Sequence, residues 1–532
     1  MKVAQQNFLT CCIWQGGTEG NKVSLRLRDF LIFLIFLLCT MGSTALASSY
    51  RADVVVVGAG GAGLAAANEA ASKKASVIVV ELDSTYGGTA AISGGGCFAV
   101  GTPLQKQEGY EDSPDLAFQD WVRWGQGEAD EQWARYYIEH SLHDLYEWLE
   151  KMGVVWEDVN LNEGNSVPRW HRPQGFGRTL AKKLYEAAQA KGVKKWLFDT
   201  QIEQILEKKG RIIGVAGTNR KTGEKVEIYG KAIVMATGGF AGSRDAVARY
   251  APWVKKYTYY VAGNRNCTGT GHEMVAQTGG YLTHMNNLWI YIYATPDYQD
   301  PAQERALVLR FFPRGNGIWL NAQGKRFHNE DLSGGASGTP AVLSQDPPFA
   351  WSLNDDTVIG SMLVMDPSYT ADFSKMHEKK LTLLNNSPFI MKADSLQELA
   401  PKMGLNPDTL IKTVTRYNNS VDAGIDTEFG RNVKSLKKIE KPLFYAIKFF
   451  PAVRKTIGGV KTNLKCQVLN KHFMPIPGLY AAGELAGMAG GHIQGKASLE
   501  GTMLGPSIFS GRVAGAWASH EAGKGKGFEG IF

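Results

Sequence analysis

A strand, a glycine-rich turn, a helix and a second strand near the start of this chain constrain its fold most strongly. Residues 54–57 are apolar, residues 58–63 read G-A-G-G-A-G, and residues 77–80 are again apolar and end at Glu81. The first glycine of such a turn allows a tight bend, the second lets a pyrophosphate approach the backbone, and the third lets the helix pack on the strand. The helix N-terminus offers N–H groups to phosphates, and the acid is placed to bind a ribose. We predict an α/β unit that binds a dinucleotide.

Length and charge leave room for a large core and exclude some partners. The chain has 532 residues, enough for two or three domains, and is 44% hydrophobic and 20% charged, as in a globular protein. Its formal net charge of +7 is mild and is not concentrated in a dense basic run. We therefore expect no nucleic-acid partner.

The first 47 residues have the parts of a secretory signal peptide. Arg26 and Arg28 precede an apolar run at 30–38, and small residues end in A-L-A at 45–47. The run is too short to span a bilayer. Extended to residue 47, it leaves an uncleaved anchor or a buried helix as alternatives. We predict export to a periplasmic or otherwise external compartment, with membrane contact only through residues 1–47.

Cysteine usage gives no sign of a metal centre or a redox pair. Cys97, Cys267 and Cys466 remain after residue 47, and no C-x-x-C occurs. Three scattered cysteines form no disulfide framework, and no cysteine–histidine spacing fits zinc or an iron–sulfur cluster. We therefore expect no metal.

The nucleotide-binding pattern is interrupted and then returns. A second glycine-rich loop spans 86–96, and an apolar strand runs into A-T-G-G, which includes Gly238. Helical patterns cover 114–151 and 178–192, and strands are expected near 197–207, 212–219, 226–229 and 232–240. Residues of about 260 to 445 are rich in aromatics and proline without βαβ rhythm. The pattern returns at 478–484, and a turn at 501–506 opens a helix that ends near 522.

This interruption predicts a nucleotide domain that is split by an insertion. The expected segments are a signal at 1–47, nucleotide-binding parts at 48–262 and 447–522, a capping domain at 263–446, and a tail at 523–532. Pockets are common where domains meet, so the active site is expected at the seam.

The ordered motifs resemble those of one family. V-V-V-V-G-A-G-G-A-G, G-G-T…S-G-G-G, A-T-G-G-F, N-A-Q-G-K-R-F-H-N-E, I-G-G-V-K-T-N and P-G-L-Y-A-A-G-E-L-A-G follow the order of the fumarate reductase/succinate dehydrogenase flavoprotein family. That family includes soluble fumarate reductases, urocanate reductase and 3-ketosteroid dehydrogenases. The resemblance spans about residues 50–520. It implies an α/β fold in which a split Rossmann-like FAD-binding domain carries an inserted α+β capping domain. It also implies hydride transfer between flavin N5 and a carbon next to an activating group.

The resemblance also implies which residues contact FAD, and Gly238 belongs with them. By position the others are Gly58, Ala59, Gly60, Gly61, Ala62, Gly63, Glu81, Gly88, Thr89, Ala90, Ser93, Gly94, Gly95, Ile202, Glu484, Thr502, Met503 and Leu504. Family members that attach FAD covalently have a histidine in the second glycine loop. Residues 89–93 contain none, so non-covalent FAD is expected.

The substrate anchors of a fumarate reductase are all changed. In the family, one arginine acts as the acid that protonates the substrate carbon, and its position here is Gly335. A second family arginine, later in the chain, has its position at about Leu499. The family's two histidine positions are Arg454 and a site near Tyr291. Reduction of fumarate is therefore not expected. The turn at 501–507 looks more like the ketosteroid dehydrogenases, but their tyrosine's position is about Ala497.

We predict redox chemistry at a C–C bond beside a carbonyl or carboxylate, on a substrate larger and less anionic than fumarate. Tyr291 is the first candidate to transfer a proton at the α-carbon, and Tyr293 and Lys496 follow. Arg454 is expected to hold the carbonyl or carboxylate oxygen. Simple core packing of the tyrosines, and surface or flavin-phosphate contacts of the cations, stay open. Arg314 matches a family arginine of a proton path and is as readily structural.

No NAD-binding motif is apparent, so electrons are expected to pass to or from a separate protein such as a cytochrome. The main alternative is an FAD-binding electron-transfer flavoprotein without chemistry of its own. A ketosteroid-dehydrogenase-like enzyme is another.

Overall fold

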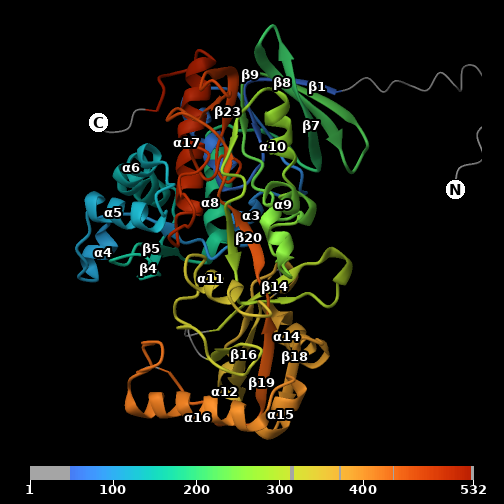
Figure 1. Cartoon of the computed structure of the whole chain (residues 1–532). Coiled ribbons are helices and arrows are strands. Elements are labelled where there is room, and N and C mark those ends of the chain that lie inside the picture. The colour runs from blue at the N-terminus through green and yellow to red at the C-terminus, as the bar shows by residue number, and fades with distance from the viewer. Residues whose placement is uncertain (1–47, 312–316, 371–372, 435, 529–532) are drawn as a thin grey trace, which may run out of the picture. The chain divides into compact units, whose positions relative to one another are not determined.

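The computed structural model describes residues 48–311, 317–370, 373–434 and 436–528. Its largest sheet has eight strands, with the order β22–β23–β9–β1–β2–β6 and with β8 and β7 joined to β9 (Figure 1). These strands are β1 (Ser48–Val57), β2 (Val77–Val80), β6 (Lys195–Leu197), β7 (Thr200–Lys208), β8 (Arg211–Asn219), β9 (Lys225–Met235), β22 (Gln467–Leu469) and β23 (Pro475–Ala481).

The centre of this sheet is parallel and buried. β1 pairs in parallel with β2 and β9, and β9 pairs in parallel with β23. Val54, Val55 and Val56 of β1 are fully buried. Parallel strands that are covered on both faces favour such continuous β-branched runs over alternating patterns.

Helices α2 (Gly61–Ser72) and α17 (Leu504–Glu521) pack against the main sheet. Helix α2 also packs against α17 and α8 (Phe176–Ala190), and α17 lies beside β23 in Figure 1. The other helices up to residue 277 are α3 (Gly88–Ala91), α4 (Pro103–Gln107), α5 (Pro114–Trp124), α6 (Glu131–His140), α7 (Glu147–Glu150), α9 (Arg244–Tyr250) and α10 (Thr270–Gln277). A separate small sheet in this part has the order β3 (Cys97–Phe98), β5 (Trp170–Pro173), β4 (Trp156–Asn160).

Two expectations about elements need correction. The helical stretch predicted over 114–151 is broken into α5, α6, a π-helical turn at Ser141–Tyr146, and α7. The two strands predicted near 226–229 and 232–240 form the single strand β9. One edge of β9 changes neighbour, because β8 pairs with its first half and β23 with its second. Gly230 and Lys231 interrupt the apolar run at that change, which explains why the sequence indicates two strands.

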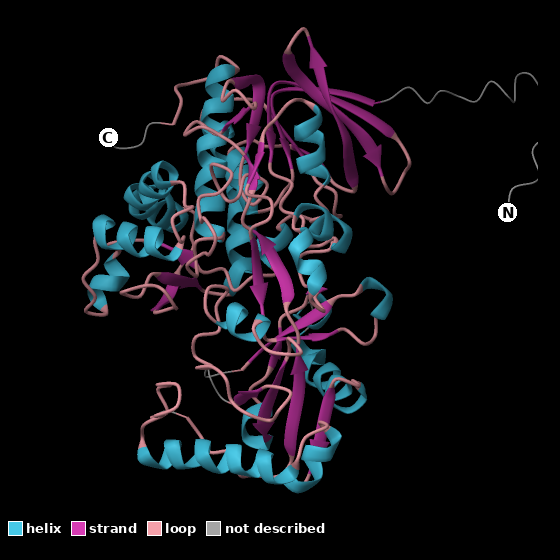
Figure 2. Ribbon diagram, in the orientation of Figure 1, coloured by secondary structure: helices cyan, strands magenta, loops and turns pink. Residues whose placement is uncertain are grey.

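The residues between the two nucleotide-binding parts form smaller, mostly antiparallel sheets (Figure 2). One has the order β15 (Ile318–Leu320), β16 (Ala350–Asp355), β19 (Phe444–Phe449), β18 (Ile390–Ala393). Another comprises β13 (Ala294–Pro296), β14 (Ala306–Arg310) and β17 (Leu363–Val364). The helices here are α11 (Gly338–Leu343), α12 (Asp356–Ile359), α13 (Pro367–Thr370), α14 (Met376–Asn386), α15 (Leu396–Lys402) and α16 (Pro407–Ala423). The prediction of an α/β fold with an α+β cap is confirmed, while the exact domain boundaries remain a prediction.

Two further pairings join the capping segment to the late part of the chain. β20 (Ala452–Thr456) lies between β10 (Tyr260–Val261) and β12 (Leu288–Tyr291). β21 (Gly459–Val460) pairs with β11 (Leu282–Thr283). Strands from residues far apart in sequence therefore meet beside the main sheet.

The predicted signal segment and Arg314 lie outside the described residues. Across the part of the chain that is described, no helix combines the length and apolarity needed to cross a bilayer.

Candidate active site

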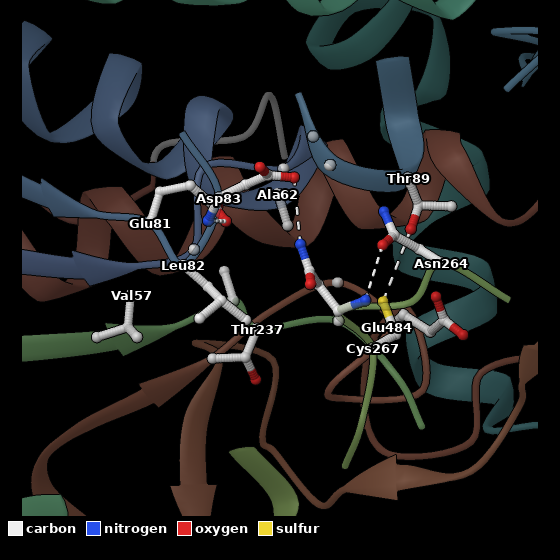
Figure 3. A pocket seen from close by; sticks show the side chains of 18 of the residues that line it. Val57, Ala62, Glu81, Leu82, Asp83, Thr89, Thr237, Asn264, Cys267 and Glu484 are labelled. Atoms are coloured by element: carbon white, nitrogen blue, oxygen red, sulfur yellow. Dashed lines mark hydrogen bonds between the residues drawn. The ribbon is translucent and has the colours of Figure 1, made fainter. Parts of the chain in front are cut away.

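A cavity of about 440 Å³ runs along the carboxyl ends of the parallel strands. Its walls come from the β1–α2 turn, the end of β2, α3, the segment 264–270, and the start of α17. Figure 3 shows Glu81 on one side of this space and Thr89, Cys267 and Glu484 on the other. Ligands of open α/β sheets bind at this edge of the strands.

The β1–α2 turn has the geometry that phosphate binding needs. Gly58 has φ +106°, and a Cβ at Gly63 would overlap the Gly58 carbonyl oxygen, so both positions require glycine. Gly60 is the N-cap of α2 and supplies no side-chain cap, while the space beside its Cα is open for at least 4 Å. The first N–H groups of α2 therefore face the cavity without a capping side chain, at the positive end of the helix dipole.

Glu81 connects the turn to the end of β2. Its carboxylate accepts hydrogen bonds from the backbone N–H groups of Ala59, at 2.6 Å, and Asp83, at 2.9 Å. Burial raises the pKa of Glu81, although these two hydrogen bonds oppose the rise. A carboxylate keeps further acceptor capacity, so Glu81 can still accept hydrogen bonds from a ribose.

The second glycine loop and a distant segment face each other across the cavity. Thr89 of α3 lies 3.7 Å, oxygen to sulfur, from Cys267, as the dashed line in Figure 3 shows. The segment around Cys267 was not predicted from the sequence, which carries no motif there. Burial raises the pKa of this thiol to about 12, so it stays protonated at neutral pH.

The far wall brings together β20 and the turn before α17. Glu484 accepts hydrogen bonds from Thr456, from the backbone N at 2.9 Å and the hydroxyl at 3.1 Å. Burial raises the pKa of Glu484, and Lys455, which also lines the cavity, opposes that rise. Helix α17 begins at Leu504 without a side-chain cap at Met503, so it presents a second positive dipole end.

The predicted FAD-contact residues divide into two sets. Those that line the cavity are Gly58, Gly60, Gly61, Ala62, Glu81, Gly88, Thr89, Ala90, Ser93, Ile202, Gly238, Glu484, Met503 and Leu504. Ala59, Gly63, Gly94, Gly95 and Thr502 lie behind or beside it. Thr502, for example, is fully buried and donates its hydroxyl hydrogen bond to the Leu499 carbonyl.

Two of the predicted catalytic residues stack on each other. Tyr291 ends β12 and is 7% exposed, and its ring lies 4.8 Å from that of Tyr293 at 26°. Arg310, at the end of β14, donates a 3.4 Å hydrogen bond to the Tyr293 hydroxyl and lies 5.7 Å from the centre of its ring. Arg310 was missed by the sequence analysis. The signal available was one charged residue at the end of the otherwise apolar strand A-L-V-L-R.

Further charged groups surround this pair. Arg454 of β20 donates a hydrogen bond to the Ala262 carbonyl and interacts electrostatically with Tyr291. Glu500 interacts electrostatically with Tyr291, Arg310 and the cavity-lining Lys455. Among the described residues, the side chains of Tyr291, Lys455 and Glu500 have no hydrogen-bond or ion-pair partner. Tyr291 is buried, whereas Lys455 and Glu500 are partly buried. A cluster of titratable side chains that make no internal hydrogen bond can bind a ligand, which marks it as a candidate binding site.

Lys496 is not brought to this cluster. Its ammonium pairs with Glu128 at 3.1 Å, and its side chain is half exposed. Gly335 lies against the Trp289 ring, where a Cβ would be 3.7 Å away, and Leu499 is buried among apolar side chains. The positions of the family's two arginines thus carry no cation.

These features of the cavity fit a flavin dinucleotide. The β1–α2 turn and the uncapped start of α2 suit its phosphates, Glu81 suits a ribose, and the uncapped start of α17 suits the flavin ring. The fold and the cavity define the class, a dinucleotide-binding flavoprotein. The sequence matches the family described as "FAD binding domain" over residues 53–504. The chain belongs to the FAD-dependent oxidoreductases of the fumarate reductase flavoprotein family, and FAD is its cofactor.

Individual relatives differ in what they are named for. The chain is 33% identical to a "Fumarate reductase (cytochrome)" of Shewanella frigidimarina, over 88% of this chain and 77% of that protein. It is 30% identical to a "Vinyl phenol reductase" of Lactiplantibacillus plantarum, over 88% of this chain and 96% of that protein. The structure of the open conformation of a flavocytochrome c3 fumarate reductase is similar, with a TM-score of 0.70 and 28% identity, over 92% of this chain and 81% of that one.

Proposed function

We propose that this enzyme transfers hydride between flavin N5 and a substrate C–C bond next to a carbonyl or carboxylate. The observation that carries the proposal is the cluster of titratable side chains Tyr291, Arg310, Arg454 and Glu500, which extends to the cavity wall through Lys455. When bound, FAD supplies the hydride donor or acceptor of the reaction.

The protein's own part is to bind, orient and move a proton. Burial raises the pKa of Tyr291 well above its usual value, so the phenol is protonated at neutral pH and can donate to the α-carbon. Arg454, fixed by the Ala262 carbonyl, would stabilise negative charge on the substrate oxygen. The Glu500 carboxylate interacts electrostatically with Tyr291 and would relay a proton from solvent to restore the phenol. Tyr293 supports the Tyr291 ring by stacking.

For the cofactor, we propose that the lining residues of the cavity hold FAD without a covalent bond, because residues 89–93 offer no histidine. Gly60 and the first turn of α2 would hold the pyrophosphate, Glu81 the ribose and Ile202 the adenine. Thr89, Ser93, Glu484 and the start of α17 would hold the rest of the cofactor. Ala59, Gly63, Gly94, Gly95 and Thr502 would support these contacts from behind.

The substrate is proposed to differ from fumarate. A dicarboxylate needs cations at both ends, and the two family arginine positions are Gly335 and Leu499. The aromatic walls at Trp289, Tyr291 and Tyr293 suit a larger, partly apolar substrate. Ketosteroids, for which relatives are named, fall within this class of substrate. A vinyl phenol, for which another relative is named, has no carbonyl or carboxylate and falls outside it.

An electron carrier and a compartment belong to the same proposal. We propose a separate redox protein such as a cytochrome as the electron partner, since one relative is named "Fumarate reductase (cytochrome)". Export through residues 1–47 would place both in the periplasm or outside the cell.

The test is reoxidation of the reduced holoenzyme. FAD-loaded full-length protein is reduced anaerobically, and flavin absorbance is followed while α,β-unsaturated acids, cyclic enones and steroids are added. Rapid reoxidation by one class supports the proposal and identifies the substrate class. Reoxidation by no member, with FAD fully loaded, would favour the electron-transfer alternative.

Tyr291→Phe tests the proton-transfer role. Reoxidation by the substrate that the panel identifies should slow by about 100-fold or more, because general acid–base groups contribute that much. FAD content should be unchanged, and Tyr293→Phe, which retains the stacked ring, should slow the reaction less. Unchanged turnover in Tyr291→Phe with intact FAD would remove Tyr291 from the mechanism.

A further inference from the structure

The end of β14 carries a cation whose hydrogen-bonding capacity is mostly unused. A guanidinium has five N–H donors. Among the described residues, Arg310 makes one hydrogen bond, the 3.4 Å contact to the Tyr293 hydroxyl. Its ring contact with Tyr293 orients the side chain without using further N–H groups. Several donors therefore have no partner within the described residues and can meet a ligand, in the planar fork that matches a carboxylate.

Positively charged side chains outnumber negatively charged ones around Tyr291. Lys455 and Glu484 act on each other at the cavity wall, each opposing the effect of burial on the other's pKa. The groups that act on Tyr291 itself are Arg310 and Arg454, which are cationic, and Glu500, which is anionic. Two cations and one carboxylate leave one positive charge uncompensated. These three charged side chains are partly buried, and a partly buried site in this state favours one anionic group and disfavours two.

We infer that Arg310 anchors the single anionic group of the substrate, and that the site therefore selects monoanions over dicarboxylates. This inference rests on the proposed function, since it concerns the same site. No sequence motif points to Arg310, because strand β14 reaches Tyr293 only through the folding of the capping region.

The first test needs no variant and is read by binding. Oxidised, FAD-loaded full-length protein is titrated with trans-cinnamate, methyl cinnamate and fumarate, and Kd comes from the change in the flavin absorption spectrum. The acid should bind at least about tenfold more tightly than its neutral ester, since hydrogen bonds to charged groups contribute that much. It should also bind more tightly than fumarate. Equal binding of acid and ester, or tighter binding of fumarate, would overturn the inference.

The second test separates Arg310 from its neighbours. Arg310→Gln should weaken cinnamate about tenfold or more and leave methyl cinnamate within about twofold. Arg310→Lys, which keeps the charge and loses the fork, should lie between. Arg416→Gln, a matched change at a cap arginine that is 63% exposed, should alter neither Kd. Equal weakening of acid and ester in Arg310→Gln would assign Arg310 to packing and overturn the inference.

Failure of the inference and failure of the proposed function look different. In one outcome, neutral enones reoxidise the flavin equally fast in wild type and Arg310→Gln, and acid and ester bind equally. This outcome would support the proposed reaction and contradict the anion site. In the other outcome, cinnamate binding depends on Arg310 but no compound reoxidises the flavin. This outcome would support the anion site and contradict the proposed reaction.

Discussion

Gly60 and Gly63 lie three residues apart in the same turn, yet the structure constrains them for different reasons. A side chain at Gly63 would overlap the Gly58 carbonyl oxygen, so its constraint comes from the protein itself. Gly60 has open space beside it and a negative φ of −76°, which any residue adopts. Its constraint would come from the pyrophosphate alone.

Alanine substitution should therefore separate folding from cofactor binding. Gly60→Ala should leave the melting temperature of the FAD-free protein unchanged and weaken FAD binding by about tenfold or more, because the methyl group enters the phosphate site. Gly63→Ala should lower the melting temperature of the FAD-free protein itself, since overpacking costs about 1–3 kcal/mol. Differential scanning calorimetry and FAD titration measure the two effects. The same melting temperature for both FAD-free variants would contradict this assignment.

At the scale of elements, helix α17 packs tightly against α2 in the nucleotide-binding part. A Cβ at Gly511 or Gly515 would overlap the carbonyl oxygen of Ala62 or Ala66. The two helices therefore touch backbone to backbone at these points. Because α2 also presents its N-terminus to the cavity, a shift of α17 would move a wall that we propose holds FAD.

Gly515→Ala should destabilise the protein although alanine is the better helix former. The gain of about 1 kcal/mol expected from helix propensity should be exceeded by overpacking against Ala66, for a net loss of roughly 1–2 kcal/mol. Chemical denaturation measures this change. Gly360→Ala is the control, since a Cβ there meets nothing within 4 Å. A stabilised Gly515→Ala variant would mean that the helices can separate at no cost.

The sequence predicts elements well where local pattern and packing agree, as in β1, α2 and β2. Their apolar runs and glycine spacing are sufficient because each feature acts within a few residues. It fails at β9, where pairing with two different strands, not local pattern, makes one element of two apolar runs. It also misses Arg310, Lys455 and Glu500. Each is an ordinary charged residue in its own segment, and only the convergence of β14, β20 and the turn before α17 gives the three a common environment.

At the scale of the whole molecule, buried histidines link stability to pH. His171 of β5 donates from Nδ1 to the Arg169 carbonyl at 2.9 Å and accepts at Nε2 from the Thr102 hydroxyl at 2.8 Å. Burial lowers the pKa of His171 and that of His272 in α10 to about 4. In the unfolded chain both would titrate near 6.5.

These two histidines should destabilise the fold in mild acid. A lowered native pKa means that unfolding takes up protons, so their contribution to stability is full above about pH 6.5 and is lost as the pH falls towards 4. The expected slope is up to about 1.4 kcal/mol per pH unit for each histidine. Urea denaturation at fixed excess FAD between pH 7.5 and 4.5 measures it. His272→Gln should reduce the slope and the exposed His377→Gln should not, and equal slopes in wild type and His272→Gln would contradict the assignment.

The shared edge of β9 also sets an order of events during synthesis. The ribosome releases β1, α2, β2 and β9 early, but β23, which covers the second half of β9, lies more than 200 residues further on. Glu484 and α17, the last parts of the cavity wall, emerge later still. A nascent chain therefore carries an open strand edge while the entire capping region is translated, and such edges invite pairing with other chains. The complete cavity for the cofactor can thus form only after Glu484 and the start of α17 have left the exit tunnel.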